Sequence, residues 1–131
     1  MNSKVPIDIK STEANGSPAY VYHSDYSNIS SIICGRMGQY GMTIVFILNE
    51  DITINSASGL TTVTFHSREN QYTEKVVISN KSKKSIYIIE KDKDLLNWLC
   101  KNDVYEITIN GVTNEAFCSA DVIRALIGKM K

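Results

Sequence analysis

The chain has 131 residues, of which 43% are apolar and 21% charged, and its 14 basic side chains balance 14 acidic ones. This length and composition are typical of one globular domain that can bury a core without disulfides. They argue against a disordered or collagen-like chain, and the zero net charge argues against a protein that binds duplex DNA mainly through excess positive charge.

The first part of the chain differs in composition from the rest. Residues 1–40 are rich in Ser, Asn, Gly and Tyr and have little hydrophobic periodicity, which predicts a loosely ordered arm. Within this arm, Ala19–His23 is β-prone and could form a first strand. Residues 41–131 predict the β-rich core of the same single domain, with two short helices.

Four segments of the core have strand patterns in succession. The continuous apolar run Thr43–Leu48 predicts a strand buried on both faces, and the alternation in Thr61–His66 predicts a half-buried strand. Short polar turns then lead into Tyr72–Ser79 and Ser85–Glu90. We therefore expect the last three of these segments to form an antiparallel meander.

The C-terminal third contains two helical patterns and a hairpin. Apolar side chains at helical spacing between Leu95 and Cys100 predict a short helix. The Asn-Gly pair that joins Val104–Asn110 to Val112–Cys118 is typical of a tight hairpin. Ser119 is expected to cap a final helix with one apolar stripe.

Together these elements predict a mainly β fold. We expect an antiparallel β-sandwich or partly open barrel of six to eight strands, with a short inserted helix and a C-terminal helix.

The order of these elements from Tyr72 onward is similar to that of a known group of proteins. The segments YTEKVVI, SIYIIE, DLLNWLCKND, VYEITI, EAFC and SADVIRALIGKM resemble the small exported β-sandwich proteins of the invasion-associated locus B type and related type VI secretion accessory proteins. The resemblance implies a sandwich with helix 94–101 between strands and the last helix packed across one end. It implies no catalytic set.

The cysteines and histidines give little sign of a reactive or metal-binding site. Cys34, Cys100 and Cys118 and the two histidines lack the spacing of zinc ligands, so we expect no metal and no cofactor. Cys34 lies near Arg36, but this pattern is too general to indicate a nucleophile, and we expect no enzyme. An odd, sparse set of cysteines favours reduced thiols in the cytoplasm, with the periplasm as the alternative if a leader has been removed.

Nucleic acid and membranes are weak candidates for the partner. The only local group of basic residues is Lys81, Lys83 and Lys84, and no aromatic residue is interleaved with them to stack on bases. A membrane-spanning helix needs about 20 apolar residues, and the longest apolar run is far shorter.

Tyrosines point to a different kind of partner. Tyr20, Tyr22, Tyr26 and Tyr40 lie among Ser, Asn and Gly, a composition typical of protein-binding loops. We expect Tyr22, Tyr26, Arg36 and Tyr40 to contact a partner protein. For Tyr22 the alternative is that it simply faces one side of an edge strand.

These observations favour a small non-enzymatic protein-binding module that sequesters a partner protein, as bacterial or bacteriophage accessory and inhibitor proteins of the immunity or anti-defence type do. The alternatives are a periplasmic envelope or secretion-associated β-sandwich protein and, third, a nucleic-acid-binding protein. The oligomeric state stays open, a homodimer included.

Overall fold

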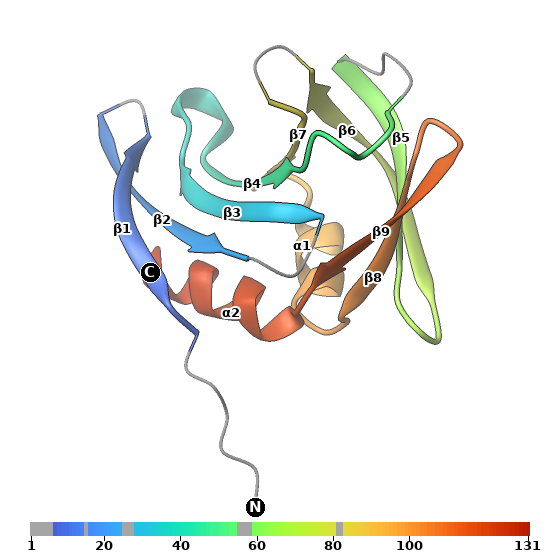
Figure 1. Cartoon of the computed structure of the whole chain (residues 1–131). Helices are drawn as coiled ribbons and strands as arrows, with labels where there is room; N and C mark the ends of the chain where they lie inside the picture. The colour runs from blue at the N-terminus through green and yellow to red at the C-terminus, as the bar shows by residue number, and fades with distance from the viewer. Residues whose placement is uncertain (1–6, 15, 25–27, 55–58, 81–82) are drawn as a thin grey trace, which may run out of the picture.

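The computed structural model describes residues 7–14, 16–24, 28–54, 59–80 and 83–131. The fold is mainly antiparallel β with one short helix and one C-terminal helix, as predicted (Figure 1). The described residues form nine strands, more than the six to eight expected. The strands are β1 (Ile9–Ala14), β2 (Ser17–His23), β3 (Ile29–Arg36), β4 (Met42–Leu48), β5 (Gly59–His66), β6 (Gln71–Ser79), β7 (Ser85–Ile89), β8 (Val104–Ile109) and β9 (Val112–Cys118), and the helices are α1 (Lys93–Leu99) and α2 (Ala120–Lys129).

All nine strands belong to one sheet in the order β1-β2-β3-β4-β7-β6-β5-β8-β9. Figure 1 shows this sheet curling around the core, so that β9 returns toward β3. Side chains join β9 to the segments that flank β3 and β4, where no strand ladder does. Asn28 Nδ2 donates to the Glu115 carbonyl oxygen at 2.6 Å, and Asn114 Nδ2 donates to the Thr53 carbonyl oxygen at 3.1 Å. The sheet is therefore open but nearly closed on itself.

The segment expected to be a loosely ordered arm differs most from its prediction. The strand expected at Ala19–His23 is present within β2, but β1 and β3 flank it and all three are part of the sheet. The alternation of β3 is interrupted by a register shift between Ile29 and Ser31, which explains why no strand pattern was evident there. Gly35 in β3 has a steric role, because a Cβ at this position would lie 3.0 Å from Cβ of Ala19.

The hairpin and meander predictions are confirmed. Strands β5, β6 and β7 pair antiparallel in succession. Asn110 and Gly111 have φ values of 50° and 84° and connect β8 to β9, as a two-residue turn of this kind requires. The left-handed conformation at the second position is the reason that glycine suits it.

Both helices contribute to a core on the inner face of the sheet, which is the face that carries Phe46 and Phe65. These two rings meet edge to face with centroids 6.1 Å apart. Helix α1 contacts β6, and α2 contacts β2 and β3. The Ser119 hydroxyl accepts from the Asp121 amide at 3.1 Å, so the predicted cap of α2 is confirmed. Neither α1 nor α2 lies on the opposite, outer face of the sheet.

Candidate protein-binding surface

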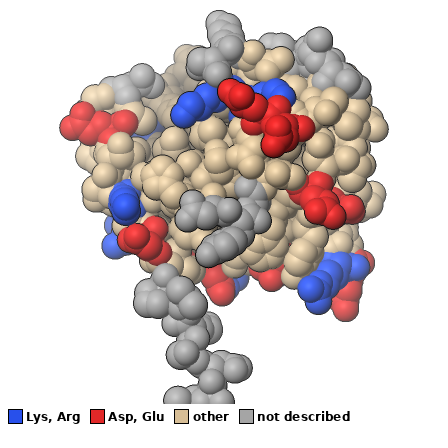
Figure 2. Space-filling view, viewed as in Figure 1, with Lys and Arg blue, Asp and Glu red and all other residues tan. Residues whose placement is uncertain are grey.

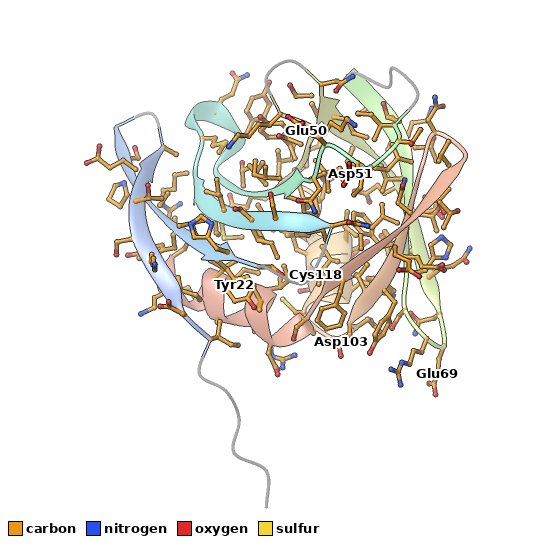
Figure 3. All side chains as sticks on the ribbon, in the orientation of Figure 1. Tyr22, Glu50, Asp51, Glu69, Asp103 and Cys118 are labelled. Carbon is orange, nitrogen blue, oxygen red and sulfur yellow. The ribbon has the colours of Figure 1, made fainter. Side chains whose placement is uncertain are left out.

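The predicted partner-binding residues do not form one surface. Tyr22 is half-buried and packs against the core, on the side of β2 that faces α2 (Figure 3). Arg36 is exposed at the end of β3, and Tyr40 is 54% exposed in a short 3₁₀ helix between β3 and β4. Tyr26 lies outside the described residues. The structure therefore places Tyr22 with the core and leaves Tyr40 at the surface.

A line of apolar side chains crosses the outer face of the sheet. Each member stands directly opposite the next on the neighbouring strand, so that the line runs across six strands without a break. We call this line the apolar row; from β2 to β5 it consists of Val21, Ile33, Val45, Tyr87, Val77 and Leu60.

Burial changes along the apolar row. Val45 in the middle of the sheet is only 3% exposed, whereas Val77 is 46% and Leu60 68% exposed. Most large apolar side chains of this protein lie in the core, so two exposed neighbours on one face are informative. The β5 end of the row is left open to solvent.

Tyr40 stands beside the open end of this row. Residues 37–40 and the outward side chains of β4, β6 and β7 line a hollow of about 570 Å³, which includes Val77, Tyr87 and Ile89. None of the nine lining residues carries a charge. An uncharged concave surface of this size suits an apolar group.

The other half of the outer face is built differently. Four threonines stand opposite one another on β6, β5, β8 and β9, and we call them the threonine row: Thr73, Thr64, Thr108 and Thr113. The hydroxyls of Thr64 and Thr73 hydrogen-bond at 2.8 Å, and those of Thr108 and Thr113 at 2.7 Å. These polar side chains satisfy one another, so the hydroxyls of this row are already hydrogen-bonded within the sheet.

Two of the three thiols, those of Cys34 and Cys118, are buried, and both histidines hydrogen-bond within the sheet. Cys34 is fully buried, and this burial raises the pKa of its thiol to about 11. His66 Nε2 is 2.8 Å from the Thr108 hydroxyl, and His23 Nδ1 is 2.9 Å from the Ser31 hydroxyl. Within the described ranges no three His, Cys, Asp or Glu side chains are arranged to hold a metal ion.

The distribution of surface charge and the hydropathy of the helices both bear on the kind of partner. Figure 2 shows acidic and basic side chains interspersed over the visible face, without a large area of one sign. Glu50 and Asp51 lie on the loop after β4, near one end of the curled sheet (Figure 3). No helix in the described part of the chain is long and apolar enough to span a membrane.

The apolar row was missed by sequence reasoning, although part of its signal was present. Thr43–Leu48 was expected to be buried on both faces, and Val45 is indeed buried on the outer side. Such a two-sided apolar strand normally indicates a second layer of structure over the outer face. Here neither α1 nor α2 supplies such a layer; Val45 is nevertheless buried, and the side chains of the row that reach the surface are Val77 and Leu60.

Comparison with known proteins found no matching family model, no matching curated protein and no matching solved structure. The resemblance to invasion-associated and secretion accessory proteins therefore stays a prediction.

Proposed function

We propose that this chain is a non-enzymatic protein-binding module that captures a partner protein on the outer face of its sheet. The observation that carries the proposal is the uncharged hollow beside Tyr40, continuous with the exposed Val77 and Leu60. A role as an accessory or inhibitor protein needs only such binding and is part of the proposal.

The extent of the surface favours a protein over a small ligand. A small molecule is usually enclosed by its pocket, which buries most of the ligand. Leu60 does not line the hollow, and a ligand confined to the hollow would leave this 68% exposed side chain in water. A partner protein can cover both, because an interface has an apolar centre and a polar rim.

The side chains that line the hollow also indicate which chemical groups of a partner would fit there. With no charged lining residue, the hollow suits an aliphatic or aromatic anchor side chain. Gln39 and Ser79 at the same hollow offer neutral hydrogen-bonding groups to the partner's backbone. Phosphate groups of a nucleic acid would find no positive charge there.

The test uses a photo-crosslinking amino acid in place of Tyr40 to capture the partner in the cells that make the protein. The identified partner is then purified, and its affinity is measured for wild type and for the variants Val77→Asp and Leu60→Asp. Thr113→Asp on the threonine row is the matched control, because it adds the same charge to the other half of the outer face.

A charge in the middle of an apolar interface removes a central anchor, which costs upward of about 2 kcal/mol, or roughly 30-fold in affinity. We expect this loss for Val77→Asp and Leu60→Asp, and unchanged affinity for Thr113→Asp. Equal affinity of all variants, or crosslinking only from position 113, would refute the proposal.

A further inference from the structure

Strand β6 lies between two neighbours whose outward side chains differ in exposure. On one side, Tyr87 of β7 is half-buried and lines the uncharged hollow. On the other side, Leu60 of β5 is 68% exposed and lies outside the hollow. Both stand directly opposite Val77 of β6. A protruding apolar side chain and a hollow that suits one therefore lie on either side of the same residue.

This arrangement is complementary to itself. A two-fold axis that runs along β6 in front of Val77 exchanges the two sides of that strand. Leu60 of a second copy is then brought in front of Tyr87, at the hollow, and Leu60 of the first copy is brought to the hollow of the second. Two protruding side chains fill two hollows, as an interface between identical copies requires.

We propose that a second copy of this chain covers the outer-face site, with Val77 beside Val77 of the second copy at the two-fold axis. The inference rests on the proposed function, because it uses the same residues and names their occupant. The two sheets pack outer face to outer face with their strands nearly aligned, as the sheets of a β-sandwich do. The second layer that neither helix supplies then comes from the second copy.

The shape of the sheet agrees with the sizes of the side chains at this contact. Figure 1 shows the sheet curling around its core, so the outer face is convex and two such faces diverge away from the axis. Val77, at the axis, is short, whereas Leu60, one strand away, is longer and more exposed. Residues 37–40, which join β3 to β4, close the hollow beyond Tyr87. The longer side chain therefore stands where the gap between the two copies is wider.

Charge permits this contact but weakens it. The apolar row and the lining of the hollow include no charged residue. On β6 the charged outward residue is Lys75, which is exposed and lies two positions from Val77 on the same face. Because the axis runs along β6, Lys75 approaches Lys75 of the second copy, and like charges oppose association. We therefore expect a weak dimer that tightens in salt.

Sedimentation equilibrium of the full chain tests the pairing. We expect wild type to dimerise below about 1 mM, and Leu60→Asp and Val77→Asp each to dimerise at least about tenfold more weakly, because a carboxylate enters an apolar contact. Lys75→Ser should dimerise more tightly than wild type at low salt, and this gain should shrink in high salt. Thr113→Asp is the matched control and should dimerise as wild type, and circular dichroism of each variant checks its fold.

A pair of opposite charges tests the position of the axis. Leu60→Asp and Tyr87→Arg each disturb the contact twice in their own homodimer. In an equimolar mixture, the introduced carboxylate faces the introduced guanidinium once, and the native contact between Leu60 and Tyr87 forms once. We therefore expect the mixed dimer to be tighter than either variant homodimer. Thr113→Arg in place of Tyr87→Arg is the control and should give no such gain.

Three results would overturn the pairing. They are a wild-type chain that stays monomeric at about 1 mM, dimerisation of Leu60→Asp and Val77→Asp equal to that of wild type, and a mixture that gains nothing over its components. A monomeric wild type leaves the proposed function standing, because capture of a partner is measured with the purified partner. Conversely, an intact dimer together with crosslinking from position 40 that recovers only this chain would refute capture of another protein and support the second copy as the occupant.

Discussion

The two halves of the outer face carry different side chains at the outward positions of paired strands. From β2 to β5 the outward residues form the apolar row, while from β6 to β9 they form the threonine row. Strands β5 and β6 belong to both: Leu60 and Val77 are in the apolar row, and Thr64 and Thr73 are in the threonine row. Valine and threonine are both β-branched and suit a strand equally well.

The threonine row shows that strands of this sheet can pair without apolar residues on their outer face. The threonine row holds four neighbouring strands with hydroxyls that bond to one another across the strand pairs. If strand formation were the only requirement, threonine would serve in the apolar row as well. The exposed apolar side chains of Val77 and Leu60 are therefore not required by strand formation alone, and the proposed binding of a partner would account for them.

The largest expected difference between the halves concerns Val45 and Thr64. Val45→Asp places a carboxylate at a position that is closed to water, and an unpaired buried charge should cost more than about 3 kcal/mol of unfolding free energy. Thr64→Asp, at a half-buried position of the threonine row, loses one hydrogen bond and some strand preference, about 1 kcal/mol. Urea unfolding of both variants measures the difference. Similar costs would mean that the outer faces of the two halves are equally open.

A second prediction concerns the one carboxylate that breaks the apolar pattern of the inner face on β6. Glu74 stands opposite the buried Val63, and its Oε2 atom is shut off from solvent. Burial, and in addition a hydrogen bond to Asp92 and the charges of Asp92 and Asp94, together raise the pKa of Glu74 to about 7. The folded protein therefore holds a proton that the unfolded chain loses at lower pH.

This difference in pKa sets the pH dependence of stability. The contribution of protonated Glu74 is fully present below about pH 4.5 and is lost as the pH rises to about 7. Glu74→Gln removes the loss, so the variant should be more stable than wild type above pH 7, by about 1 kcal/mol because solvent screens this partly exposed group. Urea unfolding at pH 4, 5.5 and 7.5 checks the trend; a difference that is constant across this range would contradict it.

A third prediction lies at the end of the threonine half. Glu106 and Glu115 stand directly opposite each other on β8 and β9, and both are exposed. Like charges at opposed positions destabilise a strand pair, so Glu115→Lys should raise the unfolding free energy by about 0.2–1 kcal/mol at low salt. The gain should shrink in high salt because the charges are screened. Glu13→Lys on β1, which faces Pro18, is a control without an opposed carboxylate.

Much of the fold could be predicted because its signals are local. Alternation predicted β5 and β8, polar turns predicted β6 and β7, the Asn110-Gly111 pair predicted the hairpin, and Ser119 predicted the start of α2. Strand β1 has four exposed residues out of six and therefore no alternation to detect. In β3 the register shift near Ile29 places buried residues out of phase.

The candidate surface could not be predicted because it depends on contacts between strands that are distant in sequence. Val45 becomes a neighbour of Tyr87 only because β4 pairs with β7. The same holds for the threonine row, in which Thr64 meets Thr108 through the pairing of β5 with β8. Of the residues expected to bind a partner, Tyr40 lines the hollow. The sequence pointed to it through the composition of the surrounding segment and not through its neighbours in space.

The smallest expected effect on stability is the most informative test of the comparison. The double variant Val77→Thr/Leu60→Thr converts the exposed end of the apolar row into an extension of the threonine pattern. Both side chains are largely exposed, and threonine keeps the β-branch at Val77 and introduces one at Leu60, so each change should alter the unfolding free energy by less than about 0.5 kcal/mol. Retention on a phenyl column should nevertheless fall, because the exposed apolar patch is gone. A loss of stability well above this value would show that the two residues are needed by the sheet itself, and the argument that they are kept for a partner would then fail.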